Sequence, residues 1–400
     1  MSTTMAASLS ETTEMFLEKV REIGPLLRER ASDVEKNGRL DEEAALFLER
    51  NGLWKLWRPR RTGGSELPLH NYAQIINEIA RYCPSTSWVT ALINGGNWVT
   101  GMFEGSVQDK INSYGDGYAC VVFAGASTTF KKAEGGYIIS GRWSYASGSQ
   151  NAAWAGLGID IVDESGTVLD VGLAFIPMNE LGYDHTWHVT GLQATGSNTI
   201  VAENVFVPDE LVLSMNGALK GEIESEFKDE ALYRSSFGVT SSFNVVAPLV
   251  GMAEGLFDYV RAGLDRNRPI SYTVYERAID SPSVQLNMAD AAQLIDTAKL
   301  HLYQATDVID TAAAEGRNLE FLEKAKARMD LGYVAKRTRE AAELLLNVSG
   351  ASGFATSNPI QRQWRDLEFA GRHGATNYDV GREIYSKALL GLDEPVASLL

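Results

Sequence analysis

The chain has 400 residues, 44% of them apolar, and a formal net charge of −16 at pH 7. This length and apolar content allow a large buried core divided among two or three packed units. Nucleic acids and anionic membranes need a basic protein surface, so the acidic balance argues against both as partners.

Targeting signals and cysteine chemistry point to a cytoplasmic protein. The first residues lack the basic start and apolar stretch of a secretory signal. No apolar run approaches the roughly 20 residues that span a bilayer. Cys83 and Cys120 are far apart and fit no metal-ligand spacing, which is typical of a reducing compartment.

Residues 1–116 are predicted to form a helical domain. Apolar residues recur at helical spacing at Phe16, Val20, Ile23 and Leu27. Asp41 stands where its carboxylate can cap a second helix over residues 42–51.

Residues 117–228 are predicted to form a β domain. Runs rich in β-branched and aromatic residues alternate there with Gly, Asp and Asn, a pattern typical of strands and turns. The predicted strands are 118–123, 136–143, 153–162, 168–176 and 199–207.

Residues 229–400 return to helical spacing and are predicted to form a bundle of long helices. One apolar series includes Phe243, Val250 and Val260, with a kink expected at Pro248. The expected fold is therefore α+β, with a β domain between two helical ones.

A hydroxyl-rich turn follows the strand predicted over residues 136–143. The stretch from Gly141 to Ser149 contains Ser147-Gly148-Ser149, where small donors can approach a flat ligand that a bulkier side chain would keep away. Serine beside glycine at a strand end is also ordinary turn chemistry. Local sequence leaves both interpretations open.

Two further stretches, in the expected order, carry a family resemblance. Residues 191–199, Gly-Leu-Gln-Ala-Thr-Gly-Ser-Asn-Thr, precede Val-Phe-Val-Pro at 205–208, and a late glycine-rich turn at 350–353 precedes Asn-Pro-Ile-Gln-Arg-Gln-Trp-Arg-Asp at 358–366. Together with the domain order, they resemble the acyl-CoA dehydrogenase fold. The resemblance implies an N-terminal helical domain, a middle β-barrel or β-sandwich, and a C-terminal four-helix bundle.

The C-terminal region departs from the dehydrogenases of that fold. These enzymes commonly carry a catalytic carboxylate in a Tyr-Glu-Gly-Thr stretch, whereas residues 372–379 here contain His373 and no such glutamate. This arrangement resembles the flavin-dependent monooxygenases of the same fold, which hydroxylate phenols, steroid-derived phenols, indoles and polyketides. The resemblance implies His373 as base or hydroperoxide partner, and Ser147 as a contact to the flavin ring.

Chemistry supports both roles. Reduced flavin and O2 form a peroxide that persists only where water is excluded and nearby donors hold its proton, as Ser147 can. Histidine, with an ordinary pKa of about 6.5, suits deprotonation of a phenol or indole near neutrality. His373 as a helix-end residue bonded to a carbonyl is the alternative. The remaining histidines show no metal spacing, so no metal is expected.

The resemblance also implies a shared cofactor site. Arg266 and Arg268 match the place where an arginine reaches the flavin phosphate of a neighbouring subunit, and guanidinium suits phosphate well. A homotetramer is therefore expected. A solvated basic helix end is the alternative.

The substrate side of the site differs from related phenol hydroxylases, which often carry a second histidine near Trp98. Here Gly95, Gly96 and Asn97 occupy that stretch. The glycines either widen the pocket for a bulkier, polycyclic substrate or permit close helix packing, and Asn97 is a candidate donor to a substrate oxygen.

Several aromatic residues are candidates for lining the pocket, although aromatics at such spacing more often belong to the core. Trp143 and Phe123 are the predicted neighbours of the flavin ring because they lie near the Ser147 turn, and Ser149 is a further predicted cofactor contact. The full set of candidate aromatics is Trp88, Trp98, Trp143, Trp154, Phe123 and Tyr378.

No strand-turn-helix with Gly-x-Gly-x-x-Gly accompanies these residues, so the chain is expected to receive reduced FAD or FMN from a separate flavin reductase. Three functions stay open. The first is hydroxylation of an aromatic or polycyclic small molecule with O2, and the second is oxygenation of nitrogen or sulfur. The third is acyl-CoA dehydrogenation with Glu254 or Asp379 as the base.

Overall fold

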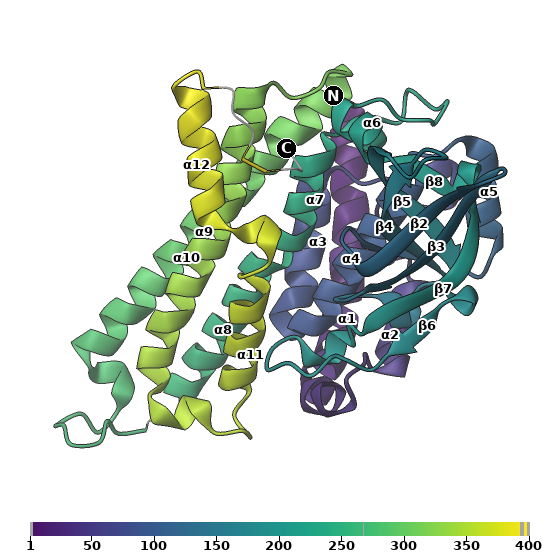
Figure 1. Cartoon of the computed structure of the whole chain (residues 1–400). Coiled ribbons are helices and arrows are strands. Elements are labelled where there is room, and N and C mark those ends of the chain that lie inside the picture. The colour runs from purple at the N-terminus through teal and green to yellow at the C-terminus, as the bar shows by residue number, and fades with distance from the viewer. Residues whose placement is uncertain (1–2, 267, 393–395, 398–400) are drawn as a thin grey trace.

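The computed structural model describes residues 3–266, 268–392 and 396–397. Helices form the first part of the chain (Figure 1). Asp41 caps α2 as predicted, because its Oδ1 accepts a hydrogen bond from the Ala44 N–H at 3.0 Å. The helices of this part are α1 (Thr3–Asn37), α2 (Glu42–Arg50), α3 (Leu69–Tyr82), α4 (Pro84–Thr100) and α5 (Gly105–Ser113).

The strands of the middle part form two four-stranded sheets, ordered β1-β4-β5-β8 and β2-β3-β7-β6. The β1–β4 pair is parallel, with Ala119 opposite Trp154, and the other pairs are antiparallel. The strands are β1 (Ala119–Val122), β2 (Ala126–Ala133), β3 (Gly136–Trp143), β4 (Trp154–Val162), β5 (Val168–Pro177), β6 (Gly182–Asp184), β7 (Thr199–Pro208) and β8 (Val212–Ser214).

Five of these strands match the predicted runs, and three do not appear in the prediction. β2 has no buried residue, so its sequence lacks the alternation of a strand with one face in the core. β6 and β8 are three residues long, too short for a periodic signal.

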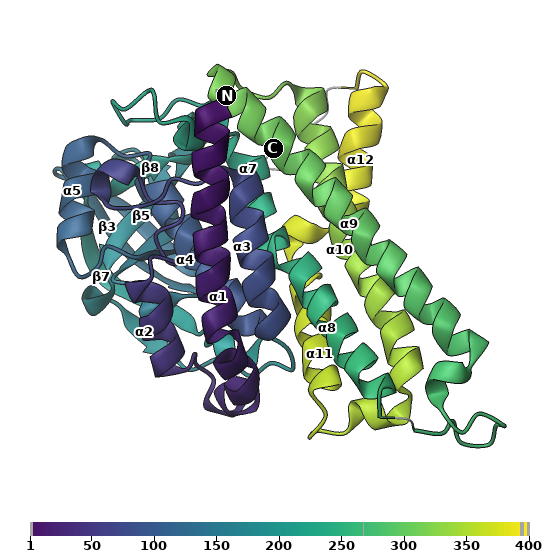
Figure 2. The same cartoon turned by 180° about the vertical axis from the view of Figure 1, so that it is seen from behind.

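Helices return in the last part of the chain, and the long ones lie alongside one another (Figures 1 and 2). Pro248 does not kink a continuous helix, because α7 ends at Val246 and Pro248 is the first residue of α8, where its missing N–H costs nothing. The helices are α6 (Met215–Lys220), α7 (Phe237–Val246), α8 (Pro248–Leu264), α9 (Pro282–Glu315), α10 (Phe321–Ser349), α11 (Pro359–Ala370) and α12 (Tyr378–Leu389).

The architecture confirms the predicted acyl-CoA dehydrogenase-like fold. Figure 2 shows α1 and α3 between the β domain and the bundle, where α3 packs against α8. Among the described helices, none combines the length and apolar character that crossing a bilayer requires.

Close packing around α4 decides the role of its two glycines. A Cβ on Gly96 would lie 1.9 Å from the carbonyl oxygen of Ala119 on β1, and one on Gly95 would lie 2.3 Å from the Asn244 amide nitrogen on α7. Both distances are far below van der Waals contact. The glycines therefore permit close approach of α4 to its neighbours, and the interpretation that they widen a pocket is not supported.

The Gly96→Ala variant is expected to be destabilised by about 1–3 kcal/mol, because the added methyl group overlaps rigid backbone. Chemical denaturation followed by circular dichroism measures the change. Gly263→Ala is the matched control: Gly263 also lies in a helix, and its added Cβ would meet no atom of a described residue within 4 Å. That variant should be stabilised by about 0.5 kcal/mol or more. Equal stability of the two variants would contradict the packing argument.

Candidate functional site

The indole of Trp88, on α4, contacts both residues predicted to be catalytic. Its Nε1–H donates a hydrogen bond to the Ser147 hydroxyl at 3.1 Å, and its ring centroid lies 6.0 Å from that of His373. Trp88 is 5% exposed, so the indole is held inside the protein. One side chain of the N-terminal helices thus joins a turn of the β domain to a turn of the C-terminal bundle.

The turn that carries Ser147 has a strained, closely packed backbone. Tyr145 and Gly148 both have positive φ, 63° and 85°. At Gly148 even a methyl group would lie 3.2 Å from the Ile93 side chain of α4, so glycine suits both the conformation and the space. The Ala146 N–H donates to the Asn198 carbonyl at 3.2 Å, which fixes the turn against the segment 191–199.

Ser147 is the half-buried end of a row of hydroxyl groups. Its oxygen lies 2.7 Å from that of Ser197, which lies 2.7 Å from that of Thr195. Thr195 donates to the Leu192 carbonyl at 2.8 Å. Thr195 and Ser197 are 3% and 1% exposed. The segment 191–199, noted for its family resemblance, therefore supports the Ser147 turn directly.

Asp366 of α11 anchors the same segment. Its Oδ1 accepts a hydrogen bond from the Leu192 N–H at 2.6 Å. Burial raises the pKa of this carboxyl to about 7, and its backbone hydrogen bond opposes the rise. The Trp-Arg-Asp stretch of the bundle is thus tied to the β domain beside the hydroxyl row.

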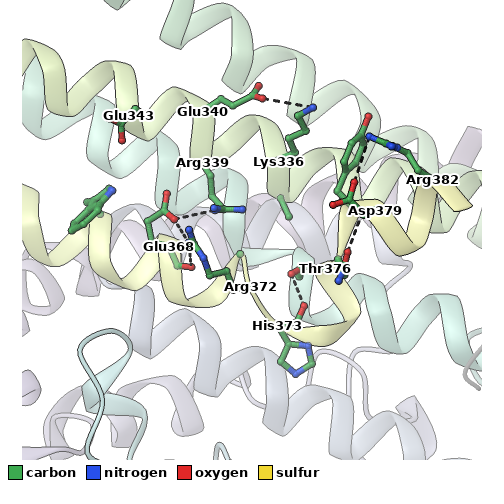
Figure 3. Close-up of a pocket in the computed structure, with 15 residues that line it drawn as sticks. Lys336, Arg339, Glu340, Glu343, Glu368, Arg372, His373, Thr376, Asp379 and Arg382 are labelled. Atoms are coloured by element: carbon green, nitrogen blue, oxygen red, sulfur yellow. Dashed lines mark hydrogen bonds and ion pairs between the residues drawn. The ribbon is translucent and has the colours of Figure 1, made fainter. Parts of the chain in front are cut away.

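His373 begins the short turn between α11 and α12 (Figure 3). Its carbonyl accepts from the Thr376 N–H and hydroxyl, at 2.8 and 2.7 Å, and its Nδ1 accepts from the Ala375 N–H at 3.2 Å. A neutral imidazole whose Nδ1 accepts carries its proton on Nε2. In this arrangement His373 offers a neighbour a hydrogen-bond donor.

The surroundings of His373 favour its neutral form. Burial is the main cause that lowers the pKa of the imidazole, and the positive charge of Arg328 lowers it further. His373 is nevertheless an exposed residue and is one of those that line a cavity, although its ring points away from the charged side chains there (Figure 3). A neutral, accessible His373 can hydrogen-bond a ligand without adding charge.

Arg328, on α10, is a buried cation without a carboxylate partner among the described residues. Its Nη2 donates to the Gly374 carbonyl at 3.3 Å, and its buried Nη1 has no hydrogen-bond partner in the residues that the structure describes. Burial lowers the pKa of the guanidinium to about 10, so it stays charged near neutrality. A positive charge therefore lies behind the turn that carries His373.

The cavity beside His373 has a volume of about 710 Å³ and lies between α10, α11 and α12. Cationic and anionic side chains face each other across it (Figure 3). Arg339 pairs with Glu368 at 3.0 Å, and Arg382 pairs with Asp379 at 3.4 Å. The cations that line it are Lys336, Arg339, Arg372 and Arg382.

Ser149 lies on a different cavity from His373. This second cavity, of about 620 Å³, is also lined by Tyr183 and His185. The Ser149 hydroxyl is buried and has no partner in the described part of the chain, and the Ser149 carbonyl accepts from the Tyr183 hydroxyl at 2.7 Å. Ser149 and His373 therefore line different cavities, and the cofactor contact expected of Ser149 stays a prediction.

The two predicted aromatic neighbours of the flavin ring differ in access. Trp143 is fully buried, and its N–H donates to the Gly158 carbonyl at 2.9 Å, so this side chain presents no surface to a ligand. Phe123 is 39% exposed and meets Phe237 of α7 edge to face at 6.1 Å. Only Phe123 keeps an accessible ring.

Asn97 is fully buried, and its amide N–H donates to the Trp54 carbonyl at 2.6 Å. Its Oδ1 is a buried acceptor that no described residue donates to. The predicted hydrogen bond from the Asn97 amide to a substrate oxygen does not fit this geometry, because the amide is buried and already donates to Trp54.

Arg266 and Arg268 lie exposed just after α8 and form no ion pair with a described residue. The structure does not bring them to Ser147 or His373 of the same chain. Asn267, between them, lies outside the described residues.

Neither carboxylate considered as a dehydrogenase base is suitably placed. Glu254 is paired with Lys299 at 3.0 Å and lies 3.9 Å from Arg81. The Asp379 side chain is 81% exposed and paired with Arg382. Among the described residues, no group of His, Cys, Asp or Glu side chains is arranged to hold a metal ion.

Sequence reasoning did not assign roles to Trp88, Arg328, Thr195 or Ser197. Trp88 was one of six candidate aromatics, without a feature that set it apart. Three hydroxyl residues within 195–199 were a usable signal, because such a density in a segment between strands indicates a hydrogen-bonding role. Nothing in the sequence around Arg328 marks it as buried.

Replacing Arg328 with Met is expected to raise the pKa of His373 toward its ordinary value, because one of the two causes that lower it is removed. Titration of the histidine ring protons by NMR measures the shift, with His373→Gln identifying the signal. Lys336→Met, which removes a cation from the wall of the same cavity, is the matched control. A His373 pKa unchanged by Arg328→Met would contradict the electrostatic assignment.

Comparison with known proteins agrees with this geometry. The family models described as acyl-CoA dehydrogenase N-terminal domain and C-terminal domain match residues 10–101 and 244–378. The oxygenase subunit HsaA of a flavin-dependent monooxygenase from Rhodococcus jostii is 29% identical over 92% of this chain and 96% of its own. The oxygenase component of an FADH(2)-dependent resorcinol hydroxylase from Rhizobium sp. is 27% identical over 94% of both chains.

A solved structure extends the similarity to three dimensions. XiaF from Streptomyces sp., in complex with FADH2 and glycerol, superposes with a TM-score of 0.94 and 29% identity over the full length of both chains. Relatives and structure agree on one fold and one cofactor class, so this chain belongs to the flavin-dependent monooxygenases of the acyl-CoA dehydrogenase fold.

Proposed function

We propose that this chain is the oxygenase component of a two-component system that hydroxylates an electron-rich aromatic ring. The observation that carries the proposal is the meeting of Ser147 and His373 at the indole of Trp88. When bound, reduced flavin supplies two electrons that activate O2, so that one oxygen atom enters the substrate and the other leaves as water. The resorcinol and p-hydroxyphenylacetate hydroxylases among the relatives support an aromatic substrate.

His373 acts on the substrate oxygen as a hydrogen-bond donor in this proposal. The Nδ1 lone pair, which a base would use, accepts from the Ala375 N–H, and the Nε2–H is free to donate. In this proposal the phenol loses its proton to solvent. Donation to the resulting phenolate oxygen, with the charge of Arg328 behind it, stabilises the anion and makes the ring a better nucleophile. The role of base, expected from the resemblance, fits this geometry less well.

The chain also offers groups that suit each part of a flavin. Ser147 is small and half-buried, so a flat ring can approach it, and Phe123, also in the β domain, keeps an exposed ring. Cations along the cavity that begins at His373 suit a phosphate-bearing tail, once they exchange their carboxylate partners. Reduced FAD or FMN, delivered by a separate reductase, is the proposed cofactor.

A homotetramer that shares its flavin sites is part of the proposal. Arg266 and Arg268 would then contact the flavin phosphate of a neighbouring subunit. The segment after α8 exposes Tyr272 and Val274 almost completely, and α9 exposes Leu300, as expected of surfaces covered by another copy. Light scattering should give the mass of four chains, and Arg268→Ala should weaken flavin binding. A monomer that binds flavin fully would contradict this arrangement.

The function is tested with the purified chain, chemically reduced FAD and 18O2, on resorcinol, p-hydroxyphenylacetate and indole-3-acetate. We expect one 18O atom in the hydroxylated product, measured by mass spectrometry. His373→Ala should lower the rate of product formation about 10²- to 10³-fold, because a donor is lost. His373→Gln should retain most of that rate, because its amide also donates.

Equal losses in His373→Gln and His373→Ala would favour a base over a donor. Release of hydrogen peroxide alone with all three substrates would contradict aromatic hydroxylation. Oxygenation of an amine or thioether, unaffected by His373→Ala, would instead support the second function that the sequence left open.

A further inference from the structure

The row of hydrogen bonds that contains Ser147 has a donor at one end and an acceptor at the other, which fixes the direction, or polarity, of the bonds between them. At one end stands the Trp88 indole N–H, which can only donate, at 3.1 Å from the Ser147 oxygen. At the other end stands the Leu192 carbonyl, which can only accept, at 2.8 Å from the Thr195 oxygen. Every proton between these ends can therefore be assigned.

The assignment starts at the carbonyl. Two oxygens 2.8 Å apart need a proton between them, and the carbonyl has none, so the Thr195 hydroxyl donates its only proton to Leu192. Thr195 must then accept from Ser197 across 2.7 Å. Because Ser197 donates its only proton to Thr195, it must accept a hydrogen bond from Ser147, also across 2.7 Å.

Ser147 is thereby left as an acceptor. Its one proton points to Ser197, one lone pair accepts from Trp88, and a second lone pair remains for a ligand. Thr195 and Ser197 are almost completely buried, so bulk water does not compete for their protons. The Leu192 carbonyl also accepts from the Trp187 indole at 3.2 Å, which helps to hold it in place.

We propose that Thr195 and Ser197 are positioning residues that make Ser147 favour reduced over oxidised flavin. The central ring of a reduced flavin carries an N–H donor at N5, where the oxidised ring has only a lone pair. A hydroxyl that can only accept forms a hydrogen bond with the N5–H of reduced flavin. Toward the N5 lone pair of oxidised flavin the same hydroxyl is unfavourable, because two acceptors then face each other. The inference rests on the proposed function, in which Ser147 contacts the flavin ring.

Anaerobic titration of the full-length chain with oxidised and with reduced FAD tests the inference, through the ratio of the two dissociation constants. In Ser197→Ala and Thr195→Val the Ser147 proton is free to turn toward the ligand. The preference for reduced FAD should then fall about 2- to 10-fold, chiefly because oxidised FAD binds more tightly. Each tenfold fall lowers the midpoint potential of bound flavin by about 30 mV.

Two variants leave the direction of the hydrogen bonds from Trp88 to the Leu192 carbonyl unchanged and serve as controls. Thr195→Ser retains the hydroxyl and should preserve the wild-type ratio. Ser144→Ala removes a hydroxyl of the same turn that bonds Thr199 at 3.0 Å, outside the row, and should also leave the ratio unchanged. Thermal unfolding checks that each variant is folded. If Ser197→Ala does not fold, comparison of Thr195→Val with Thr195→Ser decides the question.

Ser147→Ala separates the failure of this inference from that of the proposed function. If it changes neither affinity, Ser147 does not contact the flavin, and its proposed role is wrong. If it changes the ratio while Ser197→Ala and Thr195→Val keep the wild-type value, Ser147 binds flavin and the inference about polarity is overturned. If all three variants show a smaller preference for reduced over oxidised FAD than the wild type, the result supports both the proposed function and the inference about proton direction.

Discussion

The hydrogen bond from the Trp88 indole to Ser147 is the interaction on which the rest of the site depends. A buried indole needs a partner for its N–H, and here the hydroxyl that accepts from it belongs to another domain. The same ring packs near His373. Close backbone contact at Gly96 packs α4 against β1, and the indole that α4 carries lies between the two turns.

The charges around His373 determine which reaction the site can support, together with the positions of its residues. Acyl-CoA dehydrogenation on this scaffold needs an ionised carboxylate beside the substrate, and the two candidates here are paired with cations. The corresponding turn holds a neutral imidazole, with the buried charge of Arg328 close behind it. Such a site can stabilise an anionic substrate oxygen without placing a negative charge next to it.

Much of this arrangement could be predicted from the sequence, because its signals are local. β-branched runs marked five strands, and Asp41 marked a helix start. Motif positions indicated Ser147 and His373 as site residues; both contact Trp88, and their roles stay predictions. Trp143 is a case in which nearness in sequence does not predict nearness to the site. It is close to Ser147 in sequence, but successive side chains of a strand point to opposite faces, and its face is the core of the β domain. Trp88 and Arg328 depend on contacts between distant segments, which no local pattern reports.

The most direct test of the account is a crystal structure of the chain with reduced FAD, grown and frozen without oxygen. The account predicts that the flavin ring lies against the Ser147 hydroxyl, with His373 within hydrogen-bonding reach of the space beside the ring. A flavin ring bound in the second cavity, beside Ser149 and Tyr183, would contradict it.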